Sequence, residues 1–306
     1  MESDDKKILI LGAGGRLGTA LLRSFRFHTS YDLVAVTHRQ PSELPELEGL
    51  KVYQAELTER SVVKNLCIEE LPDVIINTVA LSDVDYCETH REQAWKTNVR
   101  VVEYLLQMCR LYDIALVHYS TDYVFDGEAG PYSEEDQPHP INYYGRTKLA
   151  SENLCRTSPE RTLILRTNVL YGHTRKPTFV HWVLDRLSRH QPFSVVADQY
   201  GNPTLIDDLA YATVQLVIQQ ATGLYHVGGT EWLSRYAFAR MIAEVFGYDP
   251  ELVQPTSTAA LNQKARRPLK AGLRTTRIER EFHINLTHPR QGLEVMKRQM
   301  EKQRTE

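Results

Sequence analysis

The chain has 306 residues, of which 42% are hydrophobic and 25% charged, a composition typical of a soluble globular protein with one large domain or two modest ones. The formal net charge is −3 and no basic block occurs, which argues against a nucleic-acid partner, and no apolar run is long enough for a membrane span. The N-terminal run MESDDKK is acidic, unlike a signal peptide, and the four cysteines are scattered, so we expect a reduced, cytoplasmic protein without a metal site.

Strand and helix patterns alternate through the first half of the chain. Near-continuous hydrophobic strands separated by amphipathic helices are typical of a parallel sheet covered on both faces. We therefore expect a Rossmann-like, doubly wound α/β fold. The expected strands are residues 7–11, 32–37, 51–57, 73–77, 114–120 and 161–167, and the expected helices are 19–25, 61–71, 92–113 and one that includes 144–148.

The second half of the chain is less regular. Its patterns predict helices at residues 177–189, 205–220 and 234–247, the last with Ser234 as N-cap, and strands at 193–198 and 223–229. We expect residues 1–170 to form the regular domain. Residues 171–306 are expected to form mainly a smaller α/β substrate-binding domain, with some segments returning to the first. The charged tail 296–306 predicts a solvated helix end.

A glycine-rich run, GAGGRLG, joins the first expected strand to the first helix. Its glycines are Gly12, Gly14, Gly15 and Gly18. Glycine keeps such a turn tight and lets backbone N–H groups approach a pyrophosphate at the helix N-terminus. In this strand–turn–helix context the run predicts a dinucleotide site, so residues 1–170 are assigned as an NAD(P)-binding domain.

The end of the second expected strand bears on the choice of cofactor. Dinucleotide folds that bind the adenosine ribose hydroxyls usually carry an acid about twenty residues after the glycine turn. This chain has Thr37, His38 and Arg39 there instead, and Arg39 can bind a 2′-phosphate in a bidentate way. Arg16 could supply a second cation. The pattern favours NADPH over NADH, although NADH stays open and both arginines could simply be solvated surface residues.

Tyr144 and Lys148 lie four residues apart and would share one face of a helix. A phenol has a pKa of about 10, and an ammonium ~4 Å away stabilises the phenolate by roughly 4 kcal/mol, which is about three pKa units. The pair is therefore suited to donate a proton near neutral pH. The alternative is a chance YxxxK on an exposed helix. Tyr143 competes for the role but lacks the four-residue spacing to Lys148.

Thr121 follows Ser120 at the end of the strand expected at 114–120. Open parallel sheets bind ligands at the carboxyl ends of their strands, where a hydroxyl can donate to a carbonyl oxygen that gains negative charge. Strand-end capping is the alternative, because Ser and Thr are frequent at such ends. Together with Tyr144 and Lys148, Thr121 favours carbonyl reduction by hydride transfer.

Several motifs extend this pattern along nearly the whole chain. GAGGRLG, STDYVFDG, PYSEEDQPHP, YYGRTKLASE, DQYGNPT and ARRP occur in that order. The chain resembles the extended short-chain dehydrogenase/reductase superfamily and, more narrowly, the dTDP-4-dehydrorhamnose reductase family. That family reduces the 4-keto group of dTDP-6-deoxy-L-lyxo-4-hexulose to give dTDP-L-rhamnose, with NADPH or NADH. The expected partner is thus a dTDP-sugar or related small molecule, and a homodimer stays open.

The resemblance implies roles for individual residues. Thr121, Tyr144 and Lys148 match the family's catalytic set, with Tyr144 as proton donor. Asp122, Tyr123, Phe125, Asn202 and Thr204 would contact the substrate. Together with the glycine turn, the resemblance gives the expected cofactor-binding set: Gly12, Gly14, Gly15, Arg16, Leu17, Gly18, His38, Arg39, Glu56, Leu57, Val79, Ala80, Leu81, Asn98, Ser120, Tyr144 and Lys148.

The chain departs from the family pattern at some positions near the cleft. Leu81 replaces an aromatic residue, Glu56 stands where an Asp commonly meets the adenine, and LKAGLRT follows ARRP. These changes leave the exact sugar open.

Two other functions stay open on the sequence. The regulatory β subunit of methionine adenosyltransferase shares the STDYVFDG-like and YGxTK motifs, binds NADP and docks on a partner enzyme. An epimerase or dehydratase would need additional acid–base groups, and no Glu follows Asp122 as a dehydratase would require.

Overall fold

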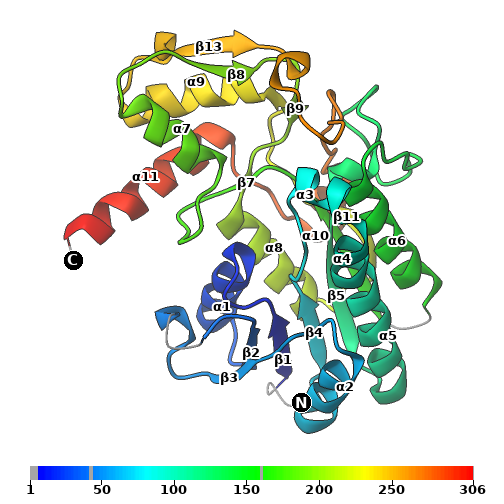
Figure 1. Ribbon diagram of the computed structural model, residues 1–306. Helices are drawn as coiled ribbons and strands as arrows, with labels where there is room; N and C mark the ends of the chain where they lie inside the picture. Colours follow the sequence, from blue (N-terminus) through cyan, green and yellow to red (C-terminus); the bar gives the residue numbers. More distant parts are fainter. Residues whose placement is uncertain (1–5, 41–43, 159–160, 306) are drawn as a thin grey trace.

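The computed structural model describes residues 6–40, 44–158 and 161–305 (Figure 1). The acidic residues at the start of the N-terminal run lie outside the described residues, as does Glu306. A seven-stranded parallel sheet forms the centre, in the order β11-β6-β5-β4-β1-β2-β3. Its strands are β1 Lys7–Leu11, β2 Asp32–Thr37, β3 Lys51–Gln54, β4 Val74–Asn77, β5 Ala115–Thr121, β6 Thr162–Thr167 and β11 Gly223–His226. The doubly wound α/β fold expected from the sequence is confirmed.

Helices cover both faces of this sheet, and the apolar strand residues form a buried core on each side. On one face, α1 and α8 pack together over a core that includes Ile8 and Ile10. On the other face, α2, α5 and α6 cover a core that includes Leu9 and Leu11 (Figure 1). The bounds are α1 Arg16–His28, α2 Arg60–Glu70, α3 Val84–Thr89, α4 Arg91–Trp95, α5 Val101–Tyr112, α6 Tyr143–Thr157, α8 Ile206–Ile218 and α10 Thr276–Phe282.

The helix expected at 92–113 is not continuous. A π-helical segment, Lys96–Arg100, separates α4 from α5. Asn98 lies in this segment and is buried, so its amide must find partners inside the protein. The strand expected at 51–57 is also shorter than predicted and ends at Gln54, since the chain turns at Glu56, whose carbonyl accepts from the Glu59 N–H.

A second lobe lies above the carboxyl ends of the sheet (Figure 1). Its core packs Phe238 and Ile242 against Leu187 and Met296. Ser234 caps α9 as expected, with its Oγ accepting from the Ala237 N–H at 3.0 Å. The lobe contains α7 Phe179–Leu187, α9 Arg235–Phe246, α11 Pro289–Thr305 and the strand pairs β8 Phe193–Val196 with β13 Val253–Thr256, β7 Leu170–Tyr171 with β10 Thr204–Leu205, and β9 Tyr200–Gly201 with β12 Leu233–Ser234.

Parts of the second half of the chain pack in the first lobe. α8 lies against α1, and β11 pairs with β6 and is contacted by α10. The sheet contains strands from both halves of the chain. The division into a cofactor-binding part, residues 1–170, and a mainly substrate-binding part, residues 171–306, stays a prediction about function.

The strand order reverses between β1 and β4, and in this kind of fold a crevice lies at such a reversal. β1 pairs with β2 on one side and with β4 on the other, so the chain leaves β1 and β4 in opposite directions. Ligands of such sheets bind at this reversal, outside the carboxyl ends of the strands. The glycine turn follows β1 there, and residues 78–81 follow β4.

Candidate active site

A cleft of about 600 Å³ lies along the carboxyl ends of the sheet strands. Most of the residues expected to bind a cofactor line it: Gly12, Gly14, Gly15, Arg16, Leu17, His38, Arg39, Glu56, Leu57, Val79, Ala80, Ser120, Tyr144 and Lys148. The glycine turn, the ends of β2 and β5, and one face of α6 thus meet at one cavity.

Glycine is required at two points of the turn. Gly12 has φ +77°, a conformation that L side chains rarely adopt. A Cβ at Gly18 would collide with the carbonyl oxygen of Gly12 and with Ala13, so only glycine lets α1 pack so closely on the turn. Gly18 acts through this packing and does not line the cleft.

Leu81 and Asn98 do not line the cleft, but they are hydrogen-bonded to each other next to lining residues. The Asn98 Oδ1 accepts from the Leu81 N–H at 2.8 Å, and its Nδ2 lies 3.1 Å from the Leu81 carbonyl oxygen. The same Nδ2 donates to the Thr147 Oγ1 at 2.9 Å. Asn98 thereby ties the segment after β4 to α6.

The two arginines predicted at the adenosine end lie differently. Arg39 and His38 are exposed and border the cleft after β2. Arg16 directs its guanidinium toward the second lobe, where Nη2 donates to the Pro177 carbonyl at 2.8 Å. Lys176 also lines the cleft. No sequence motif could have identified Lys176, because it is far from the glycine turn along the chain.

Thr121 and Tyr144 lie close together, and the hydrogen bond between their hydroxyls lowers the pKa of Tyr144. Thr121 is the last residue of β5, and its Oγ1 also lies 3.2 Å from the Asp122 Oδ1. Tyr144 lies in the first turn of α6, which Asn142 caps by accepting from the Gly145 N–H at 2.8 Å. The cap fixes the start of α6 and so the place of Tyr144.

Burial dominates the electrostatics of Tyr144 and Lys148. Burial raises the pKa of Tyr144, and the Thr121 hydrogen bond opposes this shift. Burial also lowers the pKa of Lys148 to about 8, against the carboxylate of Glu152, which raises it. Lys148 Nζ lies 3.3 Å from His118 Nε2, and the stabilisation of a Tyr144 phenolate by Lys148 stays a prediction.

His118 is a site residue that was not predicted from the sequence. Its Nε2 lies 3.3 Å from Lys148 Nζ and 2.9 Å from Ser151 Oγ, and its Nδ1 lies 3.4 Å from Asn77 Nδ2. Burial, followed by the charge of Lys148, lowers the pKa of His118 well below its ordinary value, so the ring is neutral. The available signal was a polar residue directly after the apolar run 114–117, inside the strand expected at 114–120.

The hydrogen bonds around His118 assign its proton. The Asn77 Oδ1 accepts from the Val79 N–H at 3.1 Å, which turns Asn77 Nδ2 toward the His118 Nδ1. Nδ1 is then the acceptor and Nε2 carries the proton. Ser151 donates its own proton to the Lys148 carbonyl at 2.8 Å, so its Oγ can accept from the His118 N–H. His118 therefore presents a donor rather than an acceptor beside the lysine.

The residues expected to contact a substrate fall into two groups. Tyr123 is half-buried and its ring meets that of Tyr144 edge to face, with centroids 6.1 Å apart. Asp122 is buried, accepts from Asn168 Nδ2 at 3.2 Å, and has its pKa raised by burial to about 6. Both adjoin Thr121 and Tyr144.

Phe125, Asn202 and Thr204 are occupied by packing and backbone contacts. Phe125 is fully buried and stacks on Tyr132 with centroids 4.2 Å apart. Asn202 donates to the Gly229 carbonyl at 3.0 Å and accepts from the Leu273 N–H at 2.7 Å. All three side chains are buried, and their contact with a substrate stays a prediction.

Arg166 is also structural. Its guanidinium forms a bidentate pair with Glu152, with N–O distances of 2.9 and 2.7 Å, and both side chains are 0% exposed. Its charge also lies 4.9 Å from the ring centre of Phe125. The charge of Arg235, by contrast, lowers the pKa of Asp122 and of Tyr123 and so opposes the effect of their burial.

Two hydroxyls of the cleft lack partners. Ser120 Oγ and Thr167 Oγ1 are buried and have no hydrogen-bond partner among the described residues, and both residues line the cleft. Buried polar atoms are nearly always paired, so these atoms suit a polar ligand in the cleft. Together with the glycine turn, they fit a dinucleotide.

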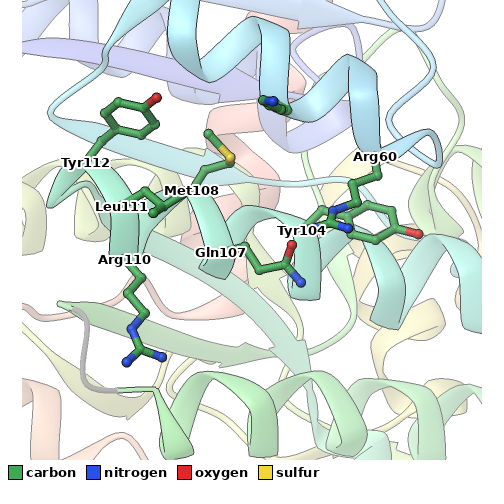
Figure 2. A pocket seen from close by; sticks show the side chains of 8 residues that line it. Arg60, Tyr104, Gln107, Met108, Arg110, Leu111 and Tyr112 are labelled. Atoms are coloured by element: carbon green, nitrogen blue, oxygen red, sulfur yellow. The ribbon is translucent and has the colours of Figure 1, made fainter.

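A second pocket of about 390 Å³ lies elsewhere, between α2 and α5 (Figure 2). Figure 2 shows its lining side chains, among them Arg60, Tyr104, Met108 and Leu111. None of the residues expected in the site lines this pocket, so it plays no part in the chemistry considered above.

No group of three or more His, Cys, Asp or Glu side chains suited to a metal ion occurs in residues 6–40, 44–158 and 161–305. Within the same ranges, no helix combines the length and the apolar character needed to cross a membrane.

Comparison with known proteins points to one family. Residues 6–302 match the family model described as the RmlD substrate binding domain. A dTDP-4-dehydrorhamnose reductase of Aggregatibacter actinomycetemcomitans is 33% identical, over 91% of this chain and 94% of its own. A probable low-salt glycan biosynthesis reductase of Haloferax volcanii is also 33% identical, over 89% of this chain and 91% of its own.

Solved structures agree with the sequence relatives. The crystal structure of a dTDP-4-dehydrorhamnose reductase of Bacillus anthracis, in complex with NADP, superposes with a TM-score of 0.87. The two proteins are 28% identical, and the match covers 96% of this chain and 99% of the other.

Proposed function

Because the chain belongs to the RmlD substrate binding domain family and, within it, to the dTDP-4-dehydrorhamnose reductases, we propose that it is an NADPH-dependent reductase of a nucleotide-linked 4-ketosugar. The most specific form of the proposal is reduction of dTDP-4-dehydrorhamnose to dTDP-L-rhamnose. The observation that carries it is that Tyr144 and Lys148 line one cleft with the glycine turn, while Thr121 is hydrogen-bonded to Tyr144. A relative of the same family is solved with NADP.

The residues of the cleft suit this cofactor. The glycine turn and the N-terminus of α1 would hold the pyrophosphate, because α1 has no acid in its first turn to oppose an anion. Arg39 would meet the 2′-phosphate. When bound, NADPH supplies the hydride that adds to the keto carbon. Ser120 and Thr167 have buried hydroxyls free for polar groups of the ligand.

The side chains of the site then handle the proton. Thr121 would donate a hydrogen bond to the keto oxygen as negative charge develops there. Tyr144 would give its phenolic proton to that oxygen, which completes the alcohol and leaves a phenolate. The Lys148 ammonium would stabilise that phenolate and hold the nicotinamide ribose. Burial keeps Tyr144 protonated, so the proton is in place before the hydride moves.

The sugar side of the site is the second lobe. We propose that residues 171–306 mainly bind the substrate, with Asp122, Tyr123 and Arg235 at the border between the lobes. The nucleotide and the sugar are the finer part of this proposal. A homodimer and a cytoplasmic location remain predictions from the sequence.

A regulatory role like that of the methionine adenosyltransferase β subunit is not favoured, because several similar relatives are named as reductases. The experiment mixes the purified protein with NADPH and a panel of nucleotide-linked 4-ketosugars and follows absorbance of the reduced nicotinamide. We expect oxidation that depends on a dTDP-linked 4-ketosugar. The absence of oxidation with every sugar, in a protein that binds NADPH, would contradict the proposal.

A further inference from the structure

The segment between β7 and α7 reaches down from the second lobe to the glycine turn (Figure 1). Arg16 fastens it, with Nη2 donating to the Pro177 carbonyl at 2.8 Å and Nε to the Lys176 carbonyl at 3.4 Å. Arg175 pairs with Glu46 at 3.4 Å on the same side. The first lobe therefore holds the backbone that carries the Lys176 side chain.

This arrangement concentrates positive charge at the adenosine end of the cleft. Arg16, Arg39 and Lys176 all line it. Burial, then the charges of Arg39 and Arg16, lower the pKa of Lys176, which is half-buried. Glu56 also lines this end, but its carboxylate lies 3.6 Å from His38 and is largely exposed. Like charges gathered in a half-buried cleft repel one another, so the site is suited to an anion.

The place of the cluster identifies the anion. The adenosine ribose of a dinucleotide reaches the end of the second strand in this fold, and β2 ends at Thr37, next to His38 and Arg39. The 2′-phosphate of NADPH is the group that carries charge there. Arg16 cannot bind this phosphate with both of these nitrogens, because its Nε and Nη2 already donate to carbonyl groups of the second lobe.

We propose that Lys176 binds the 2′-phosphate opposite Arg39, and that Arg16 is a positioning residue for Lys176 rather than a phosphate ligand. The inference rests on the proposed use of NADPH and adds a residue of the second lobe to the choice of cofactor. Lys176 is partly solvated, which weakens its charge-assisted hydrogen bond to the phosphate, so its loss should weaken NADPH binding about tenfold.

The test measures affinity by isothermal titration calorimetry, with NADPH, NADH, 2′-phospho-ADP-ribose and ADP-ribose as ligands. We expect Lys176→Ala to weaken binding of the two 2′-phosphorylated ligands about tenfold and to change binding of the other two by less than about twofold. Lys176→Arg should restore most of the loss. Lys64→Ala, which removes an exposed cation of α2 outside the cleft, should leave all four affinities unchanged.

A double-mutant cycle separates the role of Arg16 from that of Lys176. If Arg16 acts by positioning Lys176, Arg16→Ala weakens 2′-phosphate binding alone but adds little in the Lys176→Ala background. Additive losses would show that Arg16 contacts the phosphate itself and would overturn its assigned role. Equal losses with phosphorylated and unphosphorylated ligands, or no loss at all, would overturn the role of Lys176.

These outcomes are independent of the proposed reaction. Binding is measured without a sugar, so a protein that prefers 2′-phosphorylated ligands through Lys176 but reduces no ketosugar would contradict only the proposed function. A protein that reduces the sugar equally well with NADH and NADPH, and shows no 2′-phosphate preference, would contradict the inference and the preference for NADPH, but not the proposed ketosugar reduction.

Discussion

Lys148 Nζ lies 3.3 Å from the Nε2 of His118, and the surrounding hydrogen bonds give that nitrogen a proton. The buried lysine thus has a hydrogen-bond donor as its neighbour on β5. An acceptor in that place would have stabilised the charge of the lysine, and a donor does not. Its own helix supplies Glu152, whose carboxylate is already paired with Arg166. The ammonium is therefore available to ligands and phenolate in the cleft, and its charge is easily lost.

Substitution of Tyr144 separates proton transfer from binding. Tyr144→Phe removes the proton donor and keeps the ring packed against Tyr123. We expect turnover to fall by at least about 10²-fold, with NADPH affinity kept within about threefold. Tyr143→Phe is the matched control, because its hydroxyl is one helix position away, and it should keep most activity. Full activity in Tyr144→Phe would show that another group donates the proton.

The pH dependence should follow Lys148. Its pKa is about 8, so the ammonium is present below that pH and is lost as the pH rises through it. We expect kcat/KM for the ketosugar to decline above pH 8. In His118→Gln, the side-chain amide can offer its oxygen to Lys148, and the decline should shift to higher pH by about one unit.

The control for His118→Gln is His139→Gln, at an exposed histidine, which should leave the profile unchanged. A profile that stays the same in His118→Gln, in a variant that folds and binds NADPH, would contradict the role assigned to His118.

Lys148 should also lower the stability of the fold. Its pKa falls from 10.5 to about 8 on folding, so the unfolded chain holds this proton more tightly. Below pH 8 the buried charge costs on the order of 3 kcal/mol, and the cost fades as the pH rises toward 10.5. Lys148→Met should thus raise the free energy of unfolding at pH 7, measured with denaturant, and abolish turnover. A less stable variant at pH 7 would contradict this balance.

The Glu152–Arg166 pair predicts a non-additive effect on stability. Both side chains are 0% exposed, so removal of one partner leaves a buried charge uncompensated. Arg166→Met should lower the free energy of unfolding by about 3–5 kcal/mol, and Glu152→Leu with Arg166→Met should recover much of this loss. Chemical denaturation of both single variants and the double variant measures the coupling. Equal losses in single and double variants would show that the pair is not coupled.

The sequence predicted best what local patterns encode. The strands 7–11 and 32–37 agree with the structure to the residue, because apolar runs between turns have few alternatives. The glycine turn could be predicted for the same reason, since Gly12 is needed for its positive φ and Gly18 for the close packing of α1 on the turn.

The contacts between distant segments could not be predicted in this way. The hydrogen bond from Arg16 to Pro177 spans 161 positions of sequence, and no local pattern marks Lys176. His118 likewise gains its role from Lys148 and Ser151 across the sheet–helix interface. Motif likeness also could not predict the packing of Phe125 on Tyr132 or the hydrogen bond from Asn202 to Gly229, because these partners are distant in sequence or outside the motif.

The pairing of β11 with β6 has a consequence for any attempt to divide the protein. A fragment ending near residue 170 would lack β11 and α8, and it would expose both the edge of β6 and the apolar face of α1. Open strand edges of this kind recruit other chains and aggregate. Residues 1–170 therefore cannot be separated from residues 171–306, or exchanged with the matching part of a relative, without loss of this sheet pairing. Chimeras with relatives should be joined within the surface loops that cross between the lobes, with β11 kept alongside the sheet that it completes.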